Sequence, residues 1–157
     1  MLCTTAYTLA RADARDDALT MIREATRAAR ALPDAPVRGG LTRASVTLYE
    51  VGVHWALGDA GTALHAGRGL SPAQFETPER RARLHTDLAR AWRQWGRAEQ
   101  AAVQLLDACR AAPAEVRERP AIRAVAAEPT ERHCRLVAVR TLRAAVRGSG
   151  PARPFSV

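Results

Sequence analysis

The side chains best suited to chemistry in this sequence are arginines that share one side of a predicted helix. Four polar residues of the segment 82–95 form this side: Arg83, Arg90, Arg93 and Gln94. Leu88 and Trp92 fall on the opposite side at helical spacing, and we expect that side to be buried in the core. Because a guanidinium group binds a carboxylate or phosphate through two parallel hydrogen bonds, we predict a surface for an acidic group. The alternative is an ordinary solvated face.

A second basic face occurs in the segment 129–147. Five arginines gather on one side of this predicted helix: Arg132, Arg135, Arg140, Arg143 and Arg147. The other side carries mostly small and apolar residues: Cys134, Ala138, Leu142 and Ala145. Such a basic amphipathic helix suits phosphates or an acidic partner. However, Leu136, Val139 and Val146 interrupt the basic side, and the helix offers no aromatic residue to stack on bases.

Catalytic and metal-binding patterns are absent from the sequence. It contains no G-x-S-x-G, no H-E-x-x-H and no glycine-rich phosphate loop. The four histidines are scattered: His54, His65, His85 and His133. The three cysteines, Cys3, Cys109 and Cys134, form no C-x-x-C pair. We therefore predict a protein that is not an enzyme and that holds no metal and no cofactor.

The composition predicts an all-α chain of one ordinary domain. Hydrophobic residues make up 47%, largely alanine, aromatic residues make up only 4%, and the alternation typical of strands is missing. All 24 basic residues are arginine, which is typical of a genome rich in G and C and weakens a functional interpretation of the net charge of +8. Residues 116–157 carry nine arginines against three acids, so the excess lies near the end.

No stretch approaches the roughly 20 apolar residues of a membrane span, and the first residues lack the basic and apolar regions of a signal peptide. Scattered cysteines argue against a disulfide framework. We expect a cytoplasmic protein with no membrane partner.

The pattern of apolar residues and breakers predicts a series of helical hairpins. Residues 2–12 and 16–32 form the first, joined at Asp13, and residues 33–40 form a connector. Thr42 is the expected N-cap of the next helix, which ends at Gly58, and residues 60–68 follow. Ser71-Pro72 and Thr77-Pro78 are start signals before the third hairpin, which turns at Gly96. Further helices are expected over 114–128, interrupted at Pro120, and over 129–147.

The third hairpin resembles a tetratricopeptide repeat. The series that carries the resemblance keeps the repeat's spacing throughout: His85, Leu88, Ala89, Trp92, Ala101, Leu105 and Pro113. The register recurs at Ala18, Ala63 and Ala101, at intervals of 45 and 38 residues against about 34 for an ideal repeat. The second hairpin matches least, with Glu50 and His54 at positions of larger apolar residues, so a register shifted by one residue stays open. The resemblance implies stacked antiparallel hairpins whose first helices line a concave groove.

Residues 58–128 are also similar to the C-terminal region of actinobacterial helix-turn-helix regulators of the Xre type. That resemblance implies a helical-repeat region that senses a ligand or partner beside a separate DNA-binding domain. The helix 16–32 opens with Asp16 and Asp17, which phosphates would repel, so we expect no direct reading of DNA by this chain.

We therefore expect residues 1–128 to form a helical-hairpin repeat domain, 129–147 a basic helix and 148–157 a disordered tail. The favoured function is a binding module, the sensing or protein-interaction part of a bacterial transcriptional regulator without its DNA-binding domain. Its partner would be a protein, a peptide or an acidic small ligand, and nucleic acid would be bound only indirectly. The alternatives are a stand-alone adaptor for a peptide and a small basic nucleic-acid-binding protein.

Overall fold

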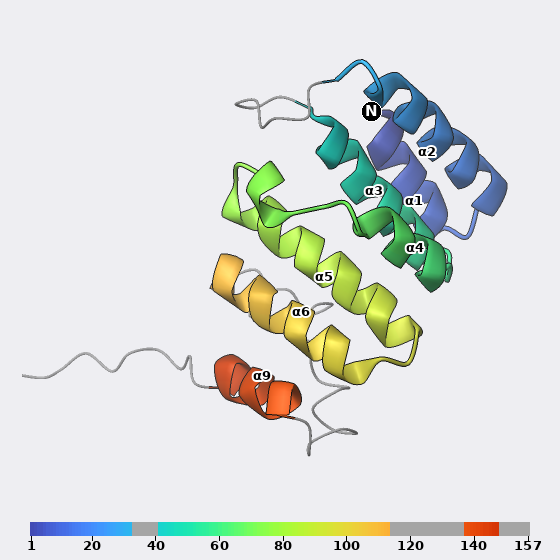
Figure 1. The fold of residues 1–157 in the computed structure, drawn as a ribbon. Helices are drawn as coiled ribbons and strands as arrows, with labels where there is room; N and C mark the ends of the chain where they lie inside the picture. Colours follow the sequence, from blue (N-terminus) through green and yellow to red (C-terminus); the bar gives the residue numbers. More distant parts are fainter. Residues whose placement is uncertain (33–40, 114–136, 148–157) are drawn as a thin grey trace, which may run out of the picture.

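The computed structural model describes residues 1–32, 41–113 and 137–147, and all regular elements within them are helices (Figure 1). Within these residues the prediction of an all-α fold is confirmed. The helices are α1 (Leu2–Arg11), α2 (Arg15–Ala29), α3 (Arg43–Ala56), α4 (Ala60–Gly67), α5 (Pro78–Gln94), α6 (Ala98–Ala111) and α9 (Val137–Arg147), with a 3₁₀ turn at Pro72–Gln74. The predicted helix over 114–128, the start of the one over 129–147 and the tail 148–157 lie outside the described residues.

Hydroxyl side chains begin the helices where the sequence predicts starts. Thr42 accepts a hydrogen bond from the backbone N–H of Ser45, and Thr77 accepts one from that of Arg80. Ser71 caps the 3₁₀ turn in the same way. These bonds satisfy backbone donors that a helix start otherwise leaves unpaired.

Three turns join the helix pairs α1–α2, α3–α4 and α5–α6, and they share one geometry. In each, a central residue has positive φ: Asp13 at 60°, Gly58 at 83° and Gly96 at 75°. The residue after it donates its N–H to a carbonyl five residues earlier, at distances of 2.9, 2.8 and 2.9 Å. The equivalent turns therefore stand 45 and 38 residues apart, the same intervals as those between Ala18, Ala63 and Ala101.

Small or β-branched residues are buried at equivalent places beside these turns. Five residues after each turn centre stands an alanine with 0% exposure: Ala18, Ala63 and Ala101. Seven residues before the centre, the side chains are also 0% exposed: Ala6, Val51 and Ala89. Paired helices approach closely where side chains are short. The turn and the small residues together explain why consecutive helices pack against each other.

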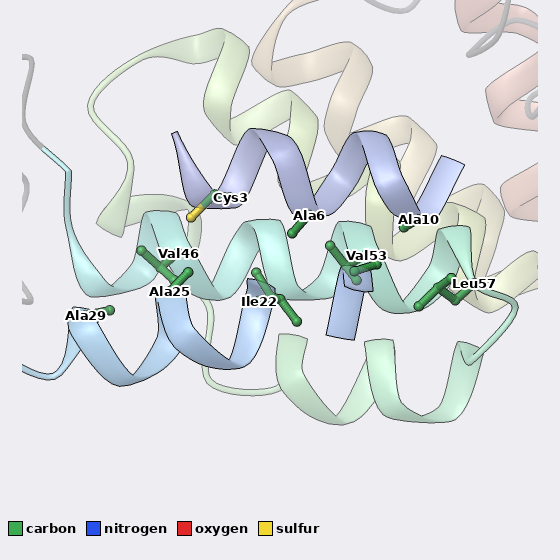
Figure 2. Close-up of a cluster of buried hydrophobic side chains, with 10 residues drawn as sticks. Cys3, Ala6, Ala10, Ile22, Ala25, Ala29, Val46, Val53 and Leu57 are labelled. Atoms are coloured by element: carbon green, nitrogen blue, oxygen red, sulfur yellow. The ribbon is translucent and has the colours of Figure 1, made fainter. Parts of the chain in front are cut away.

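The helix pairs pack against each other through α3 and α5. One core cluster joins α1, α2 and α3 around Ile22, Val46 and Val53 (Figure 2). α3 and α4 also contact α5, and Phe75, 1% exposed, fills the space between Leu48 and Leu84. On α4, a Cβ added to Gly61 would lie 2.5 Å from the ring of Trp95, so this glycine permits the close contact with the end of α5.

α9 packs on α6 through an apolar side that matches the predicted one in part. Val139 and Leu142 are 0% exposed and join a cluster with Ala102 and Leu105. Ala145, expected on the apolar side, is exposed. Leu142 and Ala138 pack on α6 as predicted. The prediction is wrong for Ala145 and for Val139, which was placed on the basic side, because Val139 packs against α6. None of the described helices is long and apolar enough to cross a membrane.

Replacing Ala101 with Leu should overpack the contact between α5 and α6 and lower the free energy of unfolding by about 1–3 kcal/mol. Ala28→Leu is the matched control, because Ala28 is exposed on α2 and should tolerate the same change. Thermal melts followed by circular dichroism measure both. Equal melting temperatures for the two variants would contradict the close contact at Ala101.

Gly96→Ala should lower stability by about 1–2 kcal/mol, because an L-residue at positive φ is strained. No atom lies within 4 Å of the added Cβ, so the effect isolates the backbone conformation. Gly69 also has no atom within 4 Å of an added Cβ and lacks a positive φ, so Gly69→Ala is the control. Urea unfolding curves should separate the two variants, and identical midpoints would count against the turn geometry.

Candidate binding surface

A buried carboxylate joins α3 and α5. The Asp87 side chain is 3% exposed. Its Oδ1 accepts hydrogen bonds from Trp55 Nε1 at 3.1 Å and Arg90 Nη1 at 3.0 Å, while Oδ2 accepts one from Arg83 Nε at 3.4 Å. A buried charge needs such partners, because leaving water is costly for an unpaired carboxylate.

Aromatic rings hold the two arginines from the other side. The Arg83 guanidinium lies 4.2 Å from the ring centre of Tyr49 and 5.6 Å from that of Tyr7. The Arg90 guanidinium lies 4.6 Å from the ring centre of Trp55. These distances suit cation–π attraction, and Tyr7 and Trp55 meet edge to face at 6.2 Å. We name Tyr7, Tyr49, Trp55, Arg83 and Arg90 the aromatic–arginine surface.

Helix periodicity explains why these residues meet. Arg83, Asp87 and Arg90 stand four and then three residues apart, so they share one side of α5. That side faces α3, which contributes Tyr49 and Trp55, and α1 contributes Tyr7. Three helices far apart in the sequence therefore build one surface.

Burial and ion pairing shift the pKa values of the ionisable groups in opposite directions. Burial raises the pKa of Asp87, and the guanidinium groups of Arg83 and Arg90 reduce this rise without reversing it. Burial alone would raise the pKa of Tyr49, but hydrogen bonds with Arg83 and Thr4 outweigh it, so the pKa falls. For Arg83, burial lowers the pKa, and attraction to Asp87 and Tyr49 turns the net shift upward. All three residues are thus electrostatically coupled.

The four residues predicted on α5 have different environments. Arg83 and Arg90 are brought together on Asp87, with side chains 33% and 15% exposed. Gln94 donates a hydrogen bond to the carbonyl of Trp55 at 2.8 Å, and Arg93 is exposed. Arg83 and Arg90 are therefore partly buried, because α3 packs against this side of α5, and the predicted binding of an acidic group stays a prediction.

The acidic and aromatic members of the surface were not predicted from the sequence. The spacing of Arg83, Asp87 and Arg90 was a usable signal, since oppositely charged residues at i, i+4 and i, i+3 pair on a helix. Tyr7, Tyr49 and Trp55 carried no comparable signal, because each comes from another helix.

The basic face of α9 is only partly within the described residues. Arg140 and Arg143 are exposed there. Arg132, Arg135 and the side chain of Arg147 lie outside the described part of the chain. The role predicted for this face stays a prediction.

A hollow of ≈ 360 Å³ lies on the pair α5–α6. Its lining residues are Trp92, Glu99, Gln100, Val103 and Gln104. His85 Nδ1 lies 2.9 Å from Gln104 Oε1 and so fixes one wall. Trp92 was expected inside the core, but it is only partly buried and lines this hollow.

In the parts of the chain that the structure describes, no three His, Cys, Asp or Glu side chains gather as metal ligands. No protein-family model, curated protein or solved structure matches this chain. The side-chain geometry is therefore the basis for a functional proposal.

Asp87→Ala should lower the free energy of unfolding by about 2–4 kcal/mol, because it leaves two partly buried arginines and Trp55 Nε1 without their acceptor. Asp107→Ala is the control, since Asp107 pairs with the exposed Arg110 and its loss should cost less than about 1 kcal/mol. Chemical denaturation measures both. Similar losses for the two variants would show that Asp87 is not the anchor of the surface.

Proposed function

We propose that this chain is a non-enzymatic helical-repeat module that binds a protein or peptide partner on the aromatic–arginine surface. The partner presents an acidic group to Arg83 and Arg90. In this proposal the module acts in the cytoplasm as the sensing or interaction region of a bacterial transcriptional regulator, and a separate domain binds DNA.

The observation that carries the proposal is the composition of the surface. Tyr, Trp and Arg are the residue types most enriched at binding hot spots. Here both tyrosines of the chain, one of its three tryptophans and two arginines gather on α1, α3 and α5. Each of the five is only partly buried, so each keeps surface for a partner.

The repeated turns support an array resembling tetratricopeptide repeats. Asp13, Gly58 and Gly96 occupy equivalent positions, and the helices that precede them are α1, α3 and α5. In arrays of that kind the first helix of each pair lines the binding groove. The aromatic–arginine surface draws its residues from these first helices alone, which agrees with that role.

The link to transcription rests on the similarity of residues 58–128 to Xre-type regulators. A stand-alone peptide adaptor would use the same surface. Direct nucleic-acid binding is a separate candidate, and the exposed Arg140 and Arg143 favour it. A gel shift with random duplex at rising salt tests this candidate, because phosphate contacts weaken steeply with salt.

A peptide library displayed on phage tests the proposed surface directly. Peptides selected on the full chain should be enriched in Asp and Glu, and Tyr49→Ala or Arg83→Gln should weaken their binding at least tenfold. Arg143→Gln removes the same charge on α9 and should leave binding unchanged. Selected peptides that bind all variants equally, or that are basic, would refute the proposal.

A further inference from the structure

Two cations of the aromatic–arginine surface converge on one carboxylate. Arg83 and Arg90 are seven residues apart on α5, so their Cα atoms stand about 10 Å apart along the helix axis. Both guanidinium groups nevertheless reach Asp87, at 3.4 Å and 3.0 Å. We infer that Asp87 is a positioning residue that holds both groups around one site for a single compact oxyanion of the partner. This inference rests on the proposed function and names the anchor of the same surface.

The two arginines have more hydrogen-bond donors than Asp87 has acceptor positions, and this favours such a site. A guanidinium group has five N–H donors, and a carboxylate has about four acceptor positions. Asp87 already accepts bonds from Trp55, Arg83 and Arg90, so it is close to saturated. Each arginine uses one N–H for Asp87, and the Arg83 guanidinium contacts Tyr49 through the face of its ring. Most donors of the pair are therefore left for another acceptor.

The arginines are also fixed before a ligand arrives. Arg83 is held between Asp87 and the ring of Tyr49, and Arg90 is held between Asp87 and the ring of Trp55. Long side chains that are already ordered lose less entropy on binding. Two positive charges beside one negative charge leave a net charge of +1, which one acidic group neutralises.

The Asp87→Asn variant distinguishes two explanations, because they predict opposite changes in the affinity for an anion. The change removes a negative charge beside the site, so electrostatics alone would make an anion bind more tightly. If Asp87 positions the arginines, the anion should bind at least tenfold more weakly. Isothermal titration of the full chain with inorganic phosphate, and separately with acetate, measures the affinity at constant ionic strength and pH 7. Asp107→Asn removes the same charge from α6 and should leave the affinity within twofold of the unmodified chain.

Each result of these titrations either supports or overturns the inference. One bound anion per chain, with weaker binding in folded Asp87→Asn, supports the inference. Equal or tighter binding in that variant overturns it, and so does the absence of binding by the unmodified chain. The failure of the inference is distinguishable from failure of the proposed function, because peptide binding that depends on Tyr49 is measured without these anions.

If the Asp87→Asn variant does not fold, a double-mutant cycle on Arg83 and Arg90 tests the inference. Arg83→Gln and Arg90→Gln should each remove most of the affinity, and the double variant should lose little more, because one anion contacts both groups. Additive losses would show two independent cations and would overturn the inference. Circular dichroism melts confirm that each variant is folded at the temperature of titration.

Discussion

The structure depends on one constraint, the three-residue turn with a positive φ at its centre. Asp13, Gly58 and Gly96 reverse the chain within so few residues that the following helix must lie directly against the preceding one. Only short side chains fit at the crossing, and the fully buried Ala18, Ala63 and Ala101 stand five residues after the three turn centres. Each pair thereby becomes a unit with the same internal register, although the connectors between pairs differ in length.

Three arginines of the described residues donate hydrogen bonds to backbone carbonyls at the connectors and turns. Arg15 donates to the carbonyl of Leu57 and pairs with Asp59, whose pKa the Arg15 hydrogen bond lowers. Arg43 donates to the carbonyl of Leu32, and Arg81 donates to that of Phe75. A guanidinium group suits this task because its several donors reach chain segments that have no regular partner. Part of the basic charge is therefore structural, which agrees with its weak value as a functional signal.

Asp87 also binds arginine side chains, and it connects one pair of helices to the next. It is buried and joins α3 to α5 through Trp55, Arg83 and Arg90. An apolar contact at this place would also hold the helices together, but it would not fix the direction of two guanidinium groups. We therefore expect the stability of the helix packing and the properties of the candidate surface to depend on the same residue.

The sequence by itself determined the helices, their caps at Thr42 and Thr77, the turns at Asp13, Gly58 and Gly96, and the buried alanines beside them. These features are local, because hydroxyl caps, φ preferences and helical spacing act within a few residues. Only the tertiary structure decided which side of α5 faces α3, that Trp92 lines a hollow, and that Val139 packs on α6. Two sides of α5 carry residues that could form a core or a binding surface. Which side is buried depends on packing with α1, α3 and α6. The aromatic–arginine surface belongs to this second class, since its five members come from three helices and no spacing within one helix reports on another.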